Sequence, residues 1–196
     1  MKRIISLLLT LCLLLTATAM AETPDKTTVT LEEAGITLDM PSNWYFAVAG
    51  QSEGSNIAQL FGLSGDILDS ILAQNGFTIY ATLDTTEQTT LSLSVVPGTS
   101  LIDMRSVDVD MDSVMEGFVS SFTVGEVVDS GVYQTEESSY IRIQCAASVQ
   151  GGTADLLIYA CNVNGLIYVF TLIAYPGADF PVEDLEAIVD SIRFID

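Results

Sequence analysis

"DLLIYACNVNGLIYVFTLIAY", residues 155–175, decides the fold. Two apolar runs of strand length flank Asn164-Gly165, a dipeptide that strongly favours a two-residue β-hairpin turn because both turn positions need a positive φ. Both runs carry apolar residues at odd and at even positions, so both faces of these strands must be buried. The sequence therefore predicts an antiparallel sheet that needs cover on both sides.

Amphipathic segments that could form the covering helices lie before and after this hairpin. The first follows Ser64, a possible N-cap, and ends at Asn75-Gly76, a typical helix stop. The second occupies residues 180–194. The apolar residues at helical spacing are Ile67, Leu68, Ile71 and Leu72 in the first segment and Leu185, Ile188, Val189 and Ile192 in the second. The simplest account is one α/β domain of mostly antiparallel strands.

Another hairpin is predicted between residues 77 and 96, where odd positions are apolar in both strands. Pairing the two apolar sets requires a loop with an odd number of residues, such as Thr85 to Thr89. The opposite, polar face carries Thr78, Tyr80, Thr82, Ser92 and Ser94. This face could line a binding surface, but a solvated sheet face explains the pattern as well.

The first 21 residues have the pattern of a secretory signal peptide. Lys2 and Arg3 precede an apolar run from Ile4 to Leu15, and Ala19-Met20-Ala21 provides the small residues of a cleavage site. We expect cleavage after Ala21, with an uncleaved anchor as the alternative. The apolar run is shorter than the roughly 20 residues of a bilayer span.

Cleavage there would leave a chain without stable membrane insertion and with a secreted or extracytoplasmic location. Residues 22–34 are expected to be a polar lead-in, and residues 35–196 to form a single domain.

The sequence is strongly acidic. It has 26 acidic and six basic residues, a formal net charge of −20. Loss of Lys2 and Arg3 with the signal peptide leaves four basic residues, so the net charge becomes 4 − 26 = −22. Such a surface repels phosphate backbones and anionic lipid heads, and nucleic-acid binding is not expected. The charge suits basic peptides or divalent cations, although plain solubility explains it as well.

The sequence contains no histidine, which is the commonest general base and zinc ligand. Ser-His-Asp and Cys-His catalytic machinery is therefore excluded. An enzyme would have to work with carboxylates, tyrosine, Lys26 or a bound ion. Paired carboxylates can hydrolyse glycosides, but pairs arise by chance in so acidic a chain. No catalytic residue is predicted.

"DVDMDSVMEG", residues 108–117, raises the question of a cation site. The candidate ligands are Asp108, Asp110, Asp112 and Glu116. Their spacing begins like a calcium loop, but Ser113 stands where such a loop needs glycine. The alternative is a capping box, with Ser113 as the N-cap and Glu116 at the third helical position. We favour the cap, so no cofactor is expected, and calcium remains the alternative.

Cys145 and Cys161 fall on neighbouring predicted strands. A loop centred on Thr153 would place them directly opposite each other, because paired residue numbers would then sum to 306. Secretion would permit a disulfide, whereas buried reduced cysteines pack well as small apolar residues. The sequence leaves both possibilities open.

Three segments resemble the PsbP-like superfamily: residues 35–44 (GITLDMPSNW), residues 161–175 and residues 185–195 (LEAIVDSIRFI). The resemblance covers roughly residues 35–196 and implies an α/β/α sandwich, with a central, mostly antiparallel sheet flanked by helices. The superfamily takes in the extrinsic PsbP protein of photosystem II, a small Ran-binding nuclear-transport protein and many secreted bacterial proteins of unknown role. No motif for a manganese cluster or for Ran is matched. Residues 56–74 depart from the simplest pattern and could shape a site of their own.

These observations predict a secreted, non-enzymatic binding or interaction module at the bacterial cell envelope, whose partner is an unknown protein or envelope component. One alternative is a carboxylate-based hydrolase. The other is a cation-dependent structural protein that uses residues 108–116.

Overall fold

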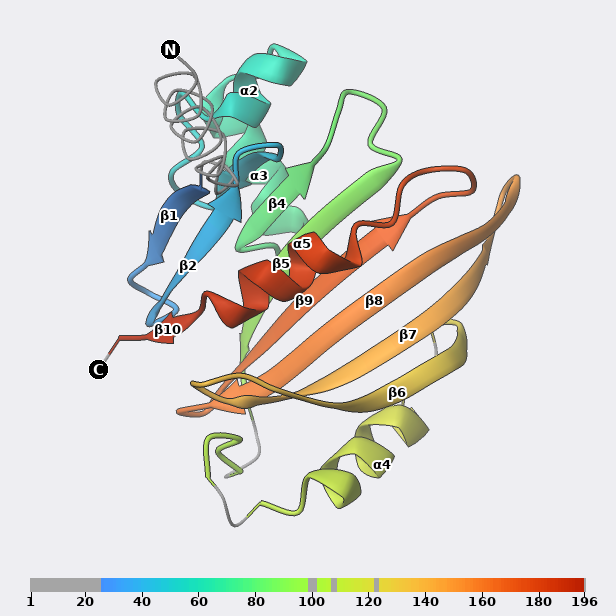
Figure 1. The fold of residues 1–196 in the computed structure, drawn as a ribbon. Helices are drawn as coiled ribbons and strands as arrows, with labels where there is room; N and C mark the ends of the chain where they lie inside the picture. Colours follow the sequence, from blue (N-terminus) through green and yellow to red (C-terminus); the bar gives the residue numbers. More distant parts are fainter. Residues whose placement is uncertain (1–25, 99–101, 107–108, 122–123, 196) are drawn as a thin grey trace, which may run out of the picture.

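The fold is known from a computed structural model that describes residues 26–98, 102–106, 109–121 and 124–195. These residues form a mixed α/β fold with a seven-stranded sheet, a three-stranded sheet and four helices (Figure 1).

The seven-stranded sheet is antiparallel throughout, as the sequence predicts for most of its strands. Its strands, in spatial order, are β3 (Tyr45–Val48), β4 (Ile79–Thr82), β5 (Thr89–Pro97), β9 (Leu166–Ala174), β8 (Gly152–Val163), β7 (Ser139–Val149) and β6 (Glu126–Gln134). Strand β8 is buried on both faces from Leu156 to Val163, which confirms the prediction from its two apolar faces.

The β8–β9 hairpin turns at the predicted dipeptide. Asn164 and Gly165 have φ values of 52° and 76°, and Val163 pairs with Leu166 directly beside the turn. Positive φ at both positions gives the turn a twist that matches that of the flanking strands. The local sequence therefore sets the register of the two central strands.

The pairing of β5 with β9 joins the two halves of the large sheet. It runs over nine residue pairs, from Thr89 opposite Ala174 to Pro97 opposite Leu166. On the other side of β5, Ile79 of β4 lies opposite Leu93, so odd-numbered apolar residues face one another as predicted. Strands β3 and β4 are thereby fixed to the central sheet through β5.

A second, smaller sheet contains residues that the sequence analysis assigned to the lead-in. Strand β1 (Lys26–Leu31) pairs with β2 (Ile36–Pro41), which also pairs with β10 (Arg193–Phe194). Residues 26–31 of the predicted lead-in therefore form a strand of this sheet. Only Val29 and Leu31 of β1 are buried, so this edge strand carries a weak apolar pattern.

The four described helices are α2 (Asn56–Phe61), α3 (Gly65–Asn75), α4 (Met111–Ser121) and α5 (Val182–Asp190). Helix α5 is shorter than the predicted 180–194, because Arg193 and Phe194 continue as β10. Helices α2 and α3 form a separate core cluster with Ala47 of β3, joined by Tyr80 of β4. Helix α4 contacts β6 and β7.

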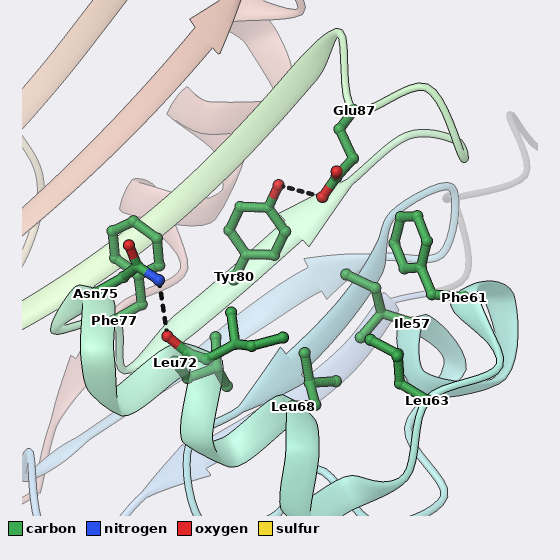
Figure 2. A pocket seen from close by; sticks show the side chains of 10 residues that line it. Ile57, Phe61, Leu63, Leu68, Leu72, Asn75, Phe77, Tyr80 and Glu87 are labelled. Atoms are coloured by element: carbon green, nitrogen blue, oxygen red, sulfur yellow. Dashed lines mark hydrogen bonds between the residues drawn. The ribbon is translucent and has the colours of Figure 1, made fainter.

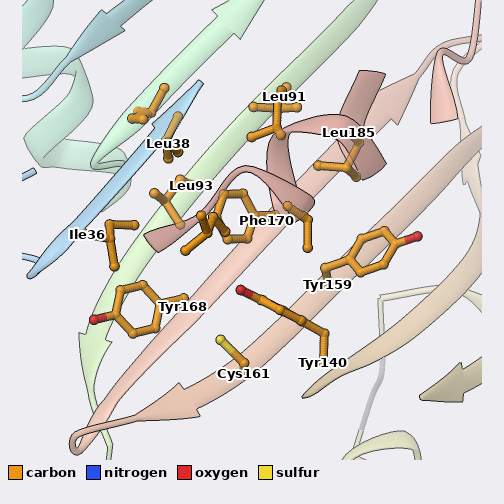
Figure 3. Packing of buried hydrophobic residues seen from close by; sticks show 14 of the residues in the cluster. Ile36, Leu38, Leu91, Leu93, Tyr140, Tyr159, Cys161, Tyr168, Phe170 and Leu185 are labelled. Atoms are coloured by element: carbon orange, nitrogen blue, oxygen red, sulfur yellow. The ribbon is translucent and has the colours of Figure 1, made fainter. Parts of the chain in front are cut away.

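The main core lies between the large sheet, the small sheet and α5 (Figure 3). It includes Ile36, Leu38, Leu91, Leu93, Tyr168, Phe170 and Leu185. The Tyr168 hydroxyl donates a hydrogen bond of 2.6 Å to the Ala34 carbonyl, which ties the large sheet to the β1–β2 turn. Because side chains alternate along a strand, this core uses the face of β4 that carries Ile79, while α2 and α3 pack on the face that carries Tyr80.

A buried indole connects the β2–β3 turn to α5. Trp44 is 1% exposed, and its Nε1 donates a hydrogen bond of 2.9 Å to Oδ2 of Asp184. The same oxygen accepts a 3.1 Å bond from Asn43. A buried N–H without a partner costs free energy, so Asp184 satisfies a donor that folding would otherwise leave unpaired.

We predict that Asp184→Ala lowers the free energy of unfolding by about 1–3 kcal/mol, the cost of leaving a buried donor unpaired. Glu183→Ala is the matched control, because Glu183 is in the same helical turn and the substitution removes the same charge. We expect the control to stay within about 0.5 kcal/mol of wild type. Urea unfolding of both variants measures the difference, and equal losses would contradict the role of the Trp44 bond.

Candidate functional site

The acidic stretch begins a helix, but the capping residue differs from the prediction. Helix α4 begins at Met111, so Asp110, and not Ser113, precedes the first helical residue. The Asp110 carboxylate accepts bonds of 3.3 Å from the Ser113 backbone N–H and 2.8 Å from its hydroxyl. These bonds hold the pKa of Asp110 below its usual value. The predicted Ser113–Glu116 capping box is therefore wrong, and the cap lies three residues earlier.

The remaining candidate ligands do not converge in the described part of the chain. Asp112 and Glu116 are exposed on α4, and Asp108 lies outside the described residues. Among residues 26–98, 102–106, 109–121 and 124–195, no group of three or more acidic or cysteine side chains could hold a metal ion. A calcium site that includes Asp108 stays a prediction.

We predict that Asp110→Asn keeps the melting temperature near that of wild type, whereas Asp110→Ala lowers it. Asparagine caps a helix about as well as aspartate, and alanine does not. Differential scanning fluorimetry of both variants, with calcium or with sodium chloride of equal ionic strength, measures the effect. A saturable rise with calcium alone, lost in Asp110→Asn, would contradict the capping role and favour a cation site.

The structure corrects the register on which the possible Cys145–Cys161 disulfide depended. Val149 pairs with Gly152 around a two-residue turn, so Cys145 lies opposite Leu156 instead of Cys161. In this register odd-numbered residues of β7 face even-numbered residues of β8. Side chains alternate along each strand, so the two cysteines point to opposite faces of the sheet.

Both cysteines are buried and free. Cys145 packs with Ala154 and Leu156, while Cys161 belongs to the main core near Tyr140 (Figure 3). Burial raises the pKa of the Cys161 thiol to about 12. The thiol is therefore protonated near neutral pH and is a poor nucleophile.

A mainly apolar pocket of about 510 Å³ lies between the α2–α3 segment and the β4–β5 hairpin (Figure 2). Its lining residues are Ile57, Phe61, Leu63, Leu68, Ile71, Leu72, Asn75, Phe77, Tyr80 and Glu87. This volume is within the usual range for small-molecule sites, which are largely apolar with a few placed polar groups. The pocket is our candidate binding site.

The α2–α3 segment is fixed to the sheet by a polar side chain from each of its two helices. Asn56 accepts a 2.7 Å bond from the Phe46 backbone N–H and donates a 3.1 Å bond to the Trp44 carbonyl. Asp69 of α3 accepts bonds of 2.5 Å from the Ser52 hydroxyl and 2.8 Å from the Gly50 backbone N–H. These bonds hold both helices against β3 and the loop that follows it.

The ends of these helices follow the sequence signals. The Ser55 hydroxyl accepts a 3.3 Å bond from the Ala58 backbone N–H and caps α2. Helix α3 starts after Ser64 and ends at Gly76, whose φ is 70°, as predicted, although the Ser64 side chain makes no capping bond. Glycine accepts this left-handed conformation without steric cost, so the chain can turn directly into Phe77 and β4.

The polar end of the pocket is built from a phenol and a carboxylate. The Tyr80 hydroxyl donates a 2.8 Å hydrogen bond to Oε1 of Glu87, and the Tyr80 ring stacks on Phe77 with centroids 5.8 Å apart. Burial raises the pKa of Tyr80, and the bond to Glu87 raises it further. Tyr80 therefore remains a protonated donor at physiological pH and cannot act as a general base there.

Glu87 has an unusual backbone conformation. Its φ is 51°, in the left-handed region that residues with a side chain rarely adopt. Such conformations cost of order 1–3 kcal/mol and cluster at functional sites. In Figure 2 the Glu87 side chain extends from the loop toward the Tyr80 hydroxyl.

Sequence reasoning found this site only in part. Tyr80 was named on a possible binding face, and residues 56–74 were named as a possible site-forming insertion. Glu87 and Phe77 were missed. The sequence did contain a signal for an open apolar surface, because α3 carries more apolar residues than the sheet covers. Leu68 and Leu72 are buried, whereas the side chains of Ile67 and Ile71 are 51% and 42% exposed.

Two other hollows are less suited to a ligand. One of about 740 Å³ lies between the β1–β2 turn and the residues after β3, and it is more polar, with Glu32 and Glu33 in its lining. Another, of only about 150 Å³, lies beside Cys161 and Phe118. Neither combines a cluster of aromatic rings with a bonded carboxylate.

The described arginines are paired with acids away from the pocket. Arg105 contacts Asp103 at 2.8 Å, Arg142 contacts Asp129 at 2.6 Å, and Arg193 lies 3.7 Å from Glu136 and from Glu137. The lining itself contains no lysine or arginine. The single charged group among the ten lining residues is Glu87.

The sequence matches no protein-family model and no curated protein. In fold, the chain is similar to the cyanobacterial PsbP (CyanoP) from Synechocystis sp. PCC 6803, with a TM-score of 0.51 at 12% identity over 90% of this chain and 96% of that one. It is also similar to a protein from Bacteroides thetaiotaomicron, with a TM-score of 0.53 at 7% identity, over 89% of this chain but only 50% of that one.

LpqN, a protein of Mycobacterium tuberculosis involved in cell envelope biogenesis, is a more distant likeness, with a TM-score of 0.43 at 14% identity over 88% of this chain and 91% of that one. The likeness to CyanoP shows that the chain has a PsbP-like fold, as the sequence motifs indicate. A shared fold does not assign a function. Within the described residues, no helix has the length and apolar character needed to cross a membrane.

Proposed function

We propose that this protein is a secreted, non-enzymatic binding module of the bacterial cell envelope. Its domain is an α/β/α sandwich whose central sheet is flanked by helices, and its ligand is an envelope component with an apolar group. The signal-peptide pattern at residues 1–21 supports an extracytoplasmic location. The ligand-sized pocket between α2, α3 and the β4–β5 hairpin carries the proposal.

The composition of the pocket favours binding over chemistry. Its walls are mostly aliphatic and aromatic, and Glu87 is the only carboxylate in the lining. Glycoside hydrolysis uses two carboxylates about 5–10 Å apart, and this lining supplies one. Tyr80, which carries the one hydroxyl in the lining, donates its hydrogen bond to Glu87. This lining supports reversible binding of an apolar group, and it offers no reason to prefer the hydrolase alternative.

The position of the pocket also suits a ligand. The buried side chains of Leu68 and Leu72 form its floor against the sheet, while the half-exposed Ile71 stands at its edge. Apolar surface that remains open to solvent between packed helices and a strand is a typical binding feature. An apolar ligand would cover Ile71 and remove this surface from water.

We predict that the neutral fluorescent probe N-phenyl-1-naphthylamine binds the protein saturably, and that Ile71→Asn weakens binding by about fivefold or more because apolar contact area is lost. Ile67→Asn is the matched control, since Ile67 is a similarly exposed isoleucine on the same helix but does not line the pocket. Fluorescence titration gives the dissociation constants.

The control should bind the probe within twofold of wild type. Equal weakening by both substitutions, or no saturable binding to the wild-type protein, would contradict the assignment of the pocket as the binding site. Circular dichroism of each variant checks that helix α3 has kept its structure.

A further inference from the structure

We propose that the pocket selects small organic cations, which place an aromatic or aliphatic body in the apolar hollow and a protonated amine against Glu87. This inference rests on the proposed function, because it assigns a ligand class to the same pocket. Three features carry it: the position of the carboxylate, the aromatic rings beside it, and the distribution of charge.

The Glu87 carboxylate is positioned to receive a donor. Its Oε1 accepts the 2.8 Å bond from Tyr80, which restricts the rotation of the carboxylate. A carboxylate has about four acceptor positions, so Glu87 can accept a further bond from a ligand ammonium group. The backbone supports this placement at a conformational cost, since φ is 51° at Glu87.

Aromatic rings share the pocket with this carboxylate. Phe61, Phe77 and Tyr80 all contribute to the lining, and the Phe77 and Tyr80 rings are stacked at an interplanar angle of 11° (Figure 2). The faces of such rings attract organic cations. Aromatic walls beside a carboxylate therefore match a ligand that combines an apolar body with a positive head.

The charge distribution disfavours the opposite kind of amphiphile. An anionic ligand, such as a fatty acid, would bring its carboxylate near Glu87 and would find no lysine or arginine in the lining. The protein has a formal net charge of −20, which raises the local concentration of cations and lowers that of anions. A neutral apolar ligand would use the hollow but would gain nothing from the carboxylate.

The test compares three ligands that share one aromatic body. These are 1-naphthylmethylamine, which is a cation at pH 7, the neutral 1-naphthylmethanol, and the anion 1-naphthylacetate. We expect isothermal titration calorimetry to show that the amine binds about 3- to 5-fold more tightly than the alcohol, the upper part of the range for one exposed charged contact. The acetate should bind more weakly than the alcohol.

Two variants locate the origin of this preference. Glu87→Gln removes the charge but keeps an acceptor for Tyr80, so the amine and the alcohol should bind within twofold of each other. Glu183→Gln on α5 removes the same charge on the opposite side of the large sheet, away from the pocket, and should keep the preference of the wild-type protein.

The outcomes separate the two proposals. If the alcohol binds and the amine binds no better, the cation preference is wrong while the pocket remains a binding site. Equal loss of preference in both variants would also overturn the role of Glu87, because net charge alone would then explain selectivity. If none of the three ligands binds, the proposed function fails, and the ligand class fails with it.

Discussion

The antiparallel pairing of β5 with β9 is the contact on which the rest of the structure depends. It connects β3–β5, from the first half of the chain, to the local meander of β6–β9. Nine residue pairs hold this junction, and its inward side chains, including Leu91, Leu93 and Phe170, face the core under α5. Without this long-range pairing the β8–β9 hairpin could still form locally, but β3, β4 and the helices on them would have no fixed position.

The candidate site is a consequence of this arrangement. Helices α2 and α3 are inserted between β3 and β4, and they pack on the face of these strands that points away from the main core. The space between these helices and the β4–β5 hairpin remains partly open. Tyr80 belongs to both the packing and the pocket. Its ring packs with the core cluster of α2 and α3, and its hydroxyl donates a hydrogen bond to Glu87. One alternating strand thus carries core residues on one face and binding residues on the other.

The sequence predicts the structure correctly where a local backbone rule determines it. The predictions were wrong where two caps or two strand registers fitted the same residues about equally well. Asn164, Gly165 and Gly76 act through positive φ, and both the hairpin turn and the end of α3 were predicted. Asp110 and Ser113 are both good N-caps, so the pattern could not choose the residue that the structure uses. The β7–β8 register depended on where a glycine-containing loop turns, and an odd shift in register reversed the relation between the cysteines. Glu87 was missed because its role depends on a bond to Tyr80 across a loop and on the packing of two helices.

The central claim is that the hollow beside α3 and Tyr80 holds the ligand, and methyl NMR tests it most directly. The protein, labelled at isoleucine and leucine methyl groups, would be titrated with 1-naphthylmethylamine. The account predicts saturable shift changes at Ile57, Leu68, Ile71 and Leu72, which line the pocket, and little change at Ile36 and Leu185 in the main core. Largest changes at Ile102 and Ile167, which line the small hollow beside Cys161, would contradict it, as would weak, unsaturable changes spread over the whole surface.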